Sequence, residues 1–176
     1  MKNKIALIIG RFQPFHLGHW HLIKRYHNAG FLIKIAIGSC EKSFKKDNPL
    51  TSIERKEIIE NAMREFKIKN YELYYVPDIN KHSQYVNHVL KIVGKFDIII
   101  TGNPIVLKTF KDYKSKKPWN IESFEEFSGR PGGEISASAI REIWLKSPSK
   151  KHLPKSTFDY LKSINFTERL RKINSS

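Results

Sequence analysis

The sequence has one cysteine among 176 residues, and this scarcity excludes two kinds of site. A single thiol cannot form a disulfide within the chain, and without partner cysteines it cannot build a thiolate zinc site. We therefore expect Cys40 to fill space beside the end of a strand rather than to act as a reactive thiol.

Long apolar runs are also absent. The first run covers only residues 5–9 and stops at Gly10 and Arg11. It is too short for the apolar core of a signal peptide, and far shorter than the roughly 20 residues that span a bilayer. We expect a cytoplasmic protein with no membrane partner.

Internal repeats, low-complexity segments and interdomain linkers are missing too. A length of 176 residues suits one domain with a full hydrophobic core, and a hydrophobic content of 40% is that of a folded chain. We expect residues 1–176 to form a single domain.

Acidic residues are few: 17 stand against 32 lysines and arginines, for a formal charge of +15. This excess favours polyanionic partners, which include nucleic acid, acidic lipid headgroups and nucleotide phosphates. Because no run of five or more like charges concentrates it, the excess also fits a solvated basic surface. Charge alone does not choose among these.

What the sequence does contain is a series of strand-like apolar runs. Three are rich in isoleucine and are followed by Gly or Thr-Gly: residues 5–9, 32–37 and 96–100. A fourth covers 71–76 and ends at Pro77. Near-continuous apolarity is typical of strands covered on both faces, and helix-length segments separate the runs. The pattern predicts a doubly wound α/β fold with a parallel sheet, followed by C-terminal helices.

Several helix starts carry capping signals. Thr51, with Glu54 three positions on, forms a capping box, and Pro104 suits a first helical position. Ser83 and Ser136 are expected to cap two further helices.

Two helices also show a predicted buried face. A first helix over about 19–28 has Trp20, Ile23 and Tyr26 at spacings of three, with Gly30 closing it. In the helix after Ser136, the residues expected to face the core are Ile140, Ile143 and Trp144. The glycine-rich stretch 127–136 reads as a loop, and two short basic helices, about 154–164 and 167–173, finish the chain.

The stretch "GRFQPFHLGH", residues 10–19, follows the first strand. Gly10 allows a sharp turn, and Gly18 at the helix opening allows close approach of a ligand to the backbone. The free N–H groups of a helix N-terminus attract anions, and His16 and His19 should project into the same space. Neither G-x-x-x-x-G-K-[ST] nor G-x-G-x-x-G follows the strand, so phosphate binding would have to use the imidazoles.

A second group lies in "EISASAIRE", residues 134–142. Ser136, Ser138 and Arg141 place hydroxyls and a guanidinium at another helix start. Alone, this pattern is typical of any capped helix. Together with the first motif, it indicates an anion site.

The chain resembles the archaeal-type nicotinamide mononucleotide (NMN) adenylyltransferases of the His-x-Gly-His nucleotidyltransferase superfamily. The resemblance spans nearly the whole chain and rests on "GRFQPFHLGH", "IGSCEKSFKKDNPLTSIERKEII", "TGNP", "ISASAIR" and "NFTERLRKI". It implies a Rossmann-like fold and the transfer of AMP from ATP to NMN, giving NAD and pyrophosphate. Ser138 replaces the usual threonine of the C-terminal motif but keeps the hydroxyl, and the spacing of "SGRPGGE" is unusual.

The resemblance also implies roles for individual residues. The expected catalytic residues, which hold the triphosphate, are Arg11, His16, His19, Arg55 and Arg141. The expected ATP-binding residues are Gly10, Phe12, Gln13, Gly18, Gly102, Asn103, Ser136 and Ser138. The residues expected at the nicotinamide end are Asp78, Asn80 and Tyr85, with Tyr85 where the family usually has tryptophan.

The implied reaction is an in-line attack of the NMN 5′-phosphate on the α-phosphate of ATP. The attacking oxygen is already ionised, so no general base is needed, and the imidazoles and guanidiniums are expected to act as cationic donors. Mg²⁺ should bridge phosphate oxygens, with no dedicated metal ligands on the protein. Members of the family often form hexamers, so we expect a homo-oligomer.

Two alternatives remain open. Another transferase of the superfamily, with phosphopantetheine, flavin mononucleotide or a cytidylyl acceptor as substrate, shares the first motif. A basic nucleic-acid-binding module would explain the charge, although no RNP, helix-turn-helix or zinc-finger pattern is present, and we expect no specific nucleic-acid partner.

Overall fold

The computed structural model describes residues 4–114, 119–123 and 136–175. Its centre is a five-stranded parallel sheet in the order β3-β2-β1-β4-β5. The strands are β1 (Ile5–Gly10), β2 (Leu32–Gly38), β3 (Tyr71–Val76), β4 (Ile98–Thr101) and β5 (Asn120–Ser123). The four predicted strands are confirmed. The edge strand β5 was missed, because four largely polar residues give no apolar signal.

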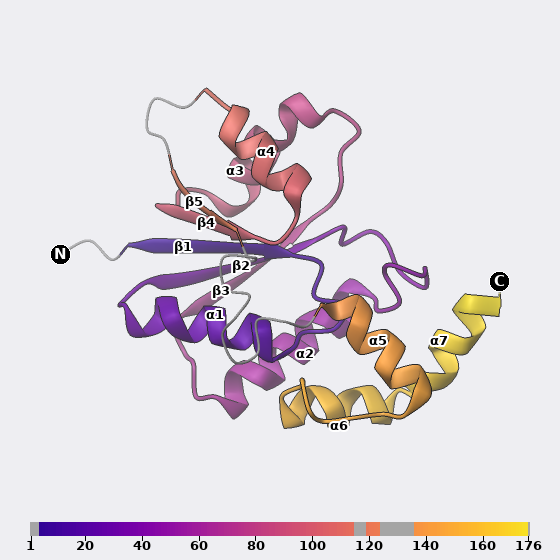
Figure 1. Cartoon of the computed structure of the whole chain (residues 1–176). Coiled ribbons are helices and arrows are strands. Elements are labelled where there is room, and N and C mark those ends of the chain that lie inside the picture. The colour runs from indigo at the N-terminus through magenta and orange to yellow at the C-terminus, as the bar shows by residue number, and fades with distance from the viewer. Residues whose placement is uncertain (1–3, 115–118, 124–135, 176) are drawn as a thin grey trace.

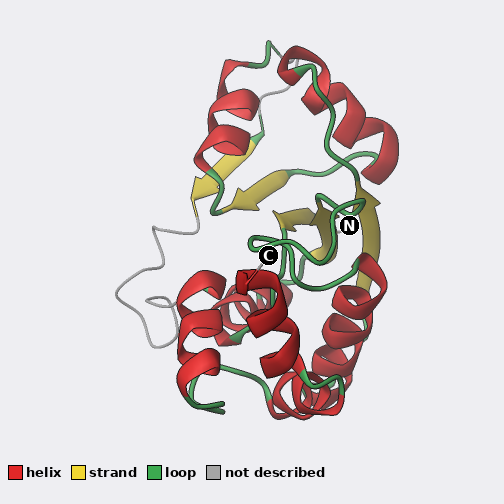
Figure 2. Ribbon diagram, turned by 90° about the vertical axis from the view of Figure 1, so that its right-hand side faces the viewer, coloured by secondary structure: helices red, strands yellow, loops and turns green. Residues whose placement is uncertain are grey.

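Helices cover both faces of this sheet (Figures 1 and 2). On one face lie α3 (Tyr85–Val93) and α4 (Pro104–Asp112), and on the other α1 (Leu17–Asn28) and α2 (Ser52–Glu65). The chain then adds α5 (Ala137–Lys146), α6 (Lys155–Ser163) and α7 (Phe166–Ser175) beside α2. This is the predicted α/β arrangement of the Rossmann-like type. None of these helices is long and apolar enough to cross a membrane.

The two faces of the sheet form two separate cores. Along β1, Ala6 and Ile8 belong to the core under α1 and α2, while Leu7 and Ile9 belong to the core under α3 and α4. All four side chains are buried. Burial on both faces explains why the strand sequence is apolar without alternation.

The capping predictions are largely confirmed. The amide of Glu54 donates to Thr51 Oγ1 at 3.2 Å, and the amide of Thr51 donates to Glu54 Oε2 at 2.8 Å. Ser136 Oγ accepts from the amide of Ala139 at 3.1 Å. Asn103 caps α4 just before Pro104. These contacts set the start of three helices whose first turns face the same end of the sheet.

Three local predictions were wrong. Helix α1 begins at Leu17, two residues before the predicted start. Ser83 lies inside a short 3₁₀ turn, η1 (His82–Gln84), and does not cap α3. Ile143 is 38% exposed, because the buried stripe of α5 passes through Ile140 and Trp144. Most of the predicted loop at 127–136 lies outside the described residues.

Candidate active site at the carboxyl ends of the strands

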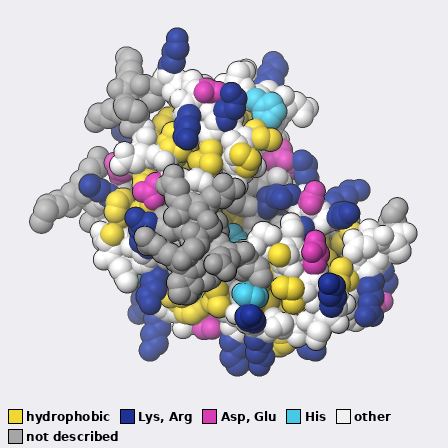
Figure 3. Space-filling view, viewed as in Figure 1, with side chains coloured by type: hydrophobic (Ala, Val, Ile, Leu, Met, Phe, Trp, Pro, Cys, Tyr) yellow, Lys and Arg dark blue, Asp and Glu magenta, His cyan; other side chains and the backbone are white. Residues whose placement is uncertain are grey.

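A cavity of about 1110 Å³ opens where β1, β2 and β4 end. Of the sixteen predicted site residues, only Gly18 and Arg55 do not line it. Ligands of parallel α/β sheets bind beyond the carboxyl ends of the strands, so the cavity lies where the topology places a site. Lysines and arginines spread over the surrounding surface rather than gathering in one patch (Figure 3).

The turn after β1 is formed by Phe12 rather than by Gly10. Phe12 has a φ of 53°, in the left-handed region that bulky residues rarely adopt, and its ring is buried. The next residue, Gln13, is 1% exposed and fixes the segment to the start of α2. Its Nε2 donates to the carbonyl of Leu50 at 3.0 Å, and its Oε1 accepts from the amide of Leu50 at 2.9 Å. The strained turn is therefore held by neighbouring structure.

The two histidines of the motif lie together, as predicted. Their ring centroids are 3.7 Å apart, and the backbone amide of His16 donates to His19 Nδ1 at 3.2 Å. The rings of Phe12 and Phe15 pack against His19, with centroids 4.8 and 5.4 Å away. These contacts hold both imidazoles at the first turn of α1, on the wall of the cavity.

Burial makes both imidazoles neutral in the free protein. It lowers the pKa of His16 to about 3, with a smaller contribution from His152. Burial, followed by the unfavourable interaction between the protonated forms of His16 and His19, lowers the pKa of His19 well below its usual value. The expectation that the histidines are cationic is therefore wrong for the free site. A neutral imidazole still donates one N–H, so the pair can hydrogen-bond to phosphate without carrying charge.

The guanidiniums that line the cavity belong to Arg11 and Arg141. Arg141 is 8% exposed, and its Nη1 donates to the carbonyl of Gln13 at 2.8 Å. Its Nη2 donates to Ser138 Oγ at 3.2 Å. Burial lowers the pKa of Arg141, and the nearby charge of Arg11 lowers it further. The C-terminal motif is thus joined to the N-terminal motif through one buried guanidinium.

Arg55 is the main correction among the predicted site residues. It is fully buried and does not line the cavity. Its guanidinium donates to four backbone carbonyls: Thr51 at 3.2 Å, Arg11 at 3.0 Å, Gly38 at 2.8 Å and Ser39 at 3.1 Å. These carbonyls belong to the start of α2, to the end of β2 and to the segments that follow β1 and β2. Arg55 therefore ties the floor of the cavity together and does not reach into it. The other exception, Gly18, is buried in the first turn of α1.

The opposite side of the cavity contains the residues predicted for the nicotinamide end. The carboxylate of Asp78 accepts from Ser39 Oγ at 2.9 and 3.0 Å and from Lys42 Nζ at 2.6 Å. Tyr85 packs edge-on against Phe110, and burial raises the pKa of its hydroxyl to about 12. Tyr85 therefore stays neutral at ordinary pH. Asn80 lines the same side.

The third strand end, at β4, provides Gly102 and Asn103. The side chain of Asn103 accepts from the amides of Ile105 at 2.9 Å and Val106 at 3.5 Å. Its amide oxygen is thus already used in capping α4. Ile105 lines the cavity and is 60% exposed, so it offers an apolar surface beside Gly102.

Among the cavity residues that sequence reasoning missed are the charged side chains of Lys42 and Asp47. Both lie between β2 and α2, where the chain is irregular and spacing gives no indication of direction. The only signal was their position inside "IGSCEKSFKKDNPL". Within the described residues, no group of three or more His, Cys, Asp or Glu side chains could hold a metal ion.

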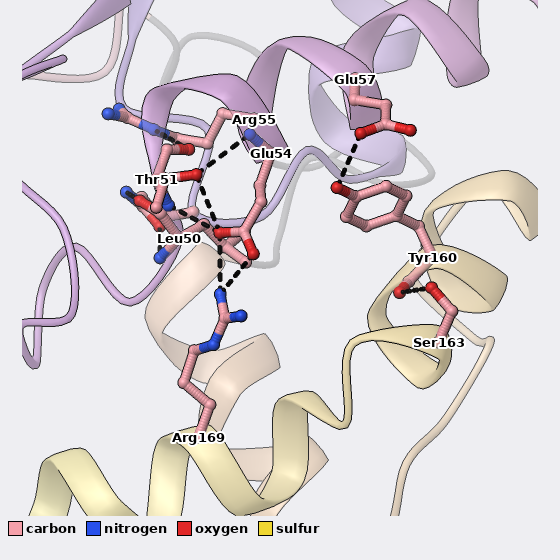
Figure 4. Close-up of polar contacts among 9 residues, drawn as sticks. Leu50, Thr51, Glu54, Arg55, Glu57, Tyr160, Ser163 and Arg169 are labelled. Carbon is pink, nitrogen blue, oxygen red and sulfur yellow. Dashed lines mark hydrogen bonds and ion pairs between the residues drawn. The ribbon is translucent and has the colours of Figure 1, made fainter.

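The C-terminal helices brace the start of α2 (Figure 4). Arg169 of α7 donates through Nη1 to both carboxylate oxygens of Glu54 at 2.7 Å, and Tyr160 of α6 donates to Glu57 at 2.9 Å. Glu54 is the capping-box residue directly before Arg55. A chain of contacts thus connects α7 to the floor of the cavity.

Comparison with known proteins agrees with this geometry. The family model described as Cytidylyltransferase-like matches residues 7–143. A relative from Thermoplasma volcanium is 31% identical over 99% of this chain and 95% of its own length, and one from Methanococcus aeolicus is 34% identical over 96% and 94%. Both relatives carry the name nicotinamide-nucleotide adenylyltransferase.

Solved structures show the same fold at lower identity. A bifunctional NMN adenylyltransferase/ADP ribose pyrophosphatase from Francisella tularensis has a TM-score of 0.76 at 20% identity, over 98% of this chain and 52% of that chain. Another structure of that protein is a complex with AMP and a manganese ion. A putative nicotinate-nucleotide adenylyltransferase from Vibrio parahaemolyticus has a TM-score of 0.63 at 16% identity, over 96% of both chains.

Proposed function

This chain belongs to the cytidylyltransferase-like family and, within it, to the nicotinamide-nucleotide adenylyltransferases, and on that premise we propose how its cavity acts. The enzyme transfers AMP from ATP to NMN and releases pyrophosphate, forming NAD. One observation carries the assignment of the site. The imidazoles of His16 and His19 lie 3.7 Å apart in the same cavity as Arg141, which hydrogen-bonds to their own motif.

The chain's main task in this reaction is to bring two anions together. The 5′-phosphate oxygen of NMN is ionised at neutral pH and attacks the α-phosphate directly, so no side chain has to remove a proton. Mutual repulsion of the substrates is offset by fixed donors that are already oriented before reaction. The neighbouring cationic groups, Arg11 and Arg141, are assigned to the pyrophosphate half of ATP, where negative charge accumulates as the bond breaks.

The two imidazoles are assigned to the α-phosphate. Because both are neutral in the free site, they act as N–H donors at the start of α1. Bound phosphate oxygens raise the pKa of a neighbouring imidazole, which strengthens donation in the complex. The pKa values of His19 and His16 should therefore rise when the negatively charged substrate binds.

The nicotinamide end is assigned to Asp78, Asn80 and Tyr85. The neutral ring of Tyr85 stacks on a pyridinium ring over less area than a tryptophan would. Asp78 keeps its carboxylate oriented through Ser39 and Lys42. Gly102, Asn103, Ser136 and Ser138 are assigned to the ATP side.

A divalent cation, Mg²⁺, is assigned to the substrate rather than to a protein site. The cavity fits a Mg–ATP complex because guanidinium and N–H donors face the phosphates, while Asp78 is already paired with Lys42. Bound to phosphate oxygens, the cation neutralises charge on the departing pyrophosphate. The manganese ion in the Francisella complex supports the use of a divalent metal.

The test is an acceptor assay with the purified chain. ATP and Mg²⁺ are incubated with NMN, deamido-NMN, phosphopantetheine or flavin mononucleotide, and with CTP and a cytidylyl acceptor in parallel, and the products are separated by chromatography. NAD and pyrophosphate in equal amounts are expected with NMN. Product formation only with another acceptor, or only with CTP, would contradict the assignment.

We further propose that residues 1–176 act as a single cytoplasmic domain that assembles as a homo-oligomer, with no specific nucleic-acid partner. Light scattering on the purified protein tests the assembly, and a monomer would contradict it. Retention on immobilised RNA at physiological salt would contradict the absence of a nucleic-acid partner.

A further inference from the structure

One acidic side chain, Asp47, lies among the cationic groups of the cavity. Its Oδ1 is 3.7 Å from Nη2 of Arg141, and its backbone carbonyl accepts from Nη1 of Arg11 at 3.5 Å. The Asp47 side chain is 69% exposed, whereas the Arg141 side chain is 10% exposed. The carboxylate therefore covers a buried guanidinium from the side of the open cavity.

The backbone fixes Asp47 in this place. A tight turn closes around it, because the amide of Lys45 donates to the carbonyl of Asn48 at 3.2 Å and the amide of Asn48 donates back at 2.9 Å. Asn48 is 6% exposed, and two residues further on Leu50 is held by Gln13. Asp47 is thus the tip of a turn that is anchored to the N-terminal motif.

The other N–H groups of Arg141 show what the carboxylate does there. Nη1 donates to Gln13 and Nη2 donates to Ser138, so both contacts hold the guanidinium in the wall. Nη2 also lies 3.7 Å from the exposed carboxylate of Asp47, a group that an incoming anion can replace. The charge of Arg11 lowers the pKa of Arg141 and the carboxylate of Asp47 raises it, so Asp47 offsets part of the repulsion between the two guanidiniums when no anionic ligand is bound.

We propose that Asp47 is a positioning residue that occupies the place of a phosphate in the empty site and gives up Arg141 when a polyphosphate enters. Its carboxylate keeps the Arg141 guanidinium in position before substrate binds, and it competes with the substrate for that guanidinium. The identity of the polyphosphate as ATP rests on the proposed function. The competition itself requires only an anion that reaches Arg141.

The test compares Asp47→Asn with the unmodified protein and with Asp159→Asn. Asp159 pairs with Lys155 on α6 and does not line the cavity, so its replacement makes the same change in net charge elsewhere. Dissociation constants for tripolyphosphate and for Mg–ATP are measured by calorimetry, and the melting temperature of the free protein is measured alongside.

Asp47→Asn is expected to bind both ligands about 2- to 5-fold more tightly, as an exposed ion pair of ordinary strength allows. The same variant should melt at a lower temperature when free, and its gain in affinity should shrink at high salt. Asp159→Asn should leave the affinity unchanged. A purely structural role would lower the melting temperature without tightening either ligand.

Unchanged or weaker binding of tripolyphosphate by Asp47→Asn overturns the proposal, as does a wild-type protein that binds no polyphosphate. Weaker binding of Mg–ATP alone also overturns it, because Asp47 would then serve the metal. Failure of the proposed function appears separately, as absence of NAD formation by a wild-type protein that still binds tripolyphosphate.

Discussion

The buried imidazole of His16 predicts that the free protein loses stability as pH falls below about 6.5. His16 is 2% exposed, and burial lowers its pKa to about 3 in the folded chain, against 6.5 when it is solvated. Between these two values the unfolded chain binds a proton that the folded chain does not. The free energy of unfolding therefore rises with pH in this window, and the stability present above pH 6.5 is lost as pH falls toward 3.

The size of the effect follows from the width of the window. Each pH unit below 6.5 costs about 1.4 kcal/mol for one such group, so His16 alone removes about 2.7 kcal/mol at pH 4.5. His19, whose pKa is also lowered by burial, adds to the loss in the same direction. Such a loss is a large part of the ~5–15 kcal/mol that stabilises a typical domain.

Urea denaturation between pH 4.5 and 7.5 measures this effect. The variant His16→Gln should lose about 2–3 kcal/mol less than the wild-type protein between pH 6.5 and 4.5. His21 lies exposed on the same helix, so His21→Gln should keep the wild-type pH dependence. Identical pH dependence in His16→Gln and wild type, or an NMR titration of His16 near 6.5, would refute the reasoning.

Three further predictions concern catalysis and the support of the site. His19→Ala should lower kcat about 10²- to 10³-fold while the ATP dissociation constant changes less, as seen by steady-state kinetics and calorimetry, and retained turnover would contradict its role. Arg55→Lys should lower the free energy of unfolding by about 3 kcal/mol, because a lysine cannot donate to four separate carbonyls. The control, Arg64→Lys at an exposed position, should change the free energy of unfolding by under about 0.5 kcal/mol. Equal effects of the two variants would contradict the role of Arg55 in holding the strand ends together. Arg169→Met should lower the free energy of unfolding by about 2 kcal/mol, and Lys172→Met, which removes only an exposed ion pair, should lower it much less. Equal losses of the two variants in chemical denaturation would contradict the stabilising role of the ion pair with Glu54.

The sheet was predictable wherever strands are buried on both faces. In β1, β2 and β4 the continuous isoleucine-rich runs predict strands that are buried on both faces. The edge strand β5 differs, because Asn120–Ser123 depends on pairing with β4 rather than on an apolar pattern. Pairing of that kind is a property of the assembled sheet and leaves no trace in a single short segment.

The site was predictable where a residue directly follows a strand or opens a helix, as His16 and Arg141 do. The direction in which a long side chain points was not predictable from the sequence. Arg55 sits in the first turn of α2, where solvent, substrate and interior are all within its reach, and the convergence of four carbonyls appears only after the strand ends are placed. The neutral state of His16 likewise depends on burial, which spacing does not reveal.

The ion pair between Arg169 and Glu54 has a consequence for the order in which the enzyme matures. Every residue that lines the cavity precedes Arg169 in the chain and is synthesised before it. Until α7 packs against α2, the carboxylate of Glu54 lacks its partner Arg169, and the start of α2, which carries Arg55, is held less firmly. A chain truncated before Arg169 should therefore fold its sheet yet handle nucleotide poorly, because the capping box beside Arg55 lacks its ion pair.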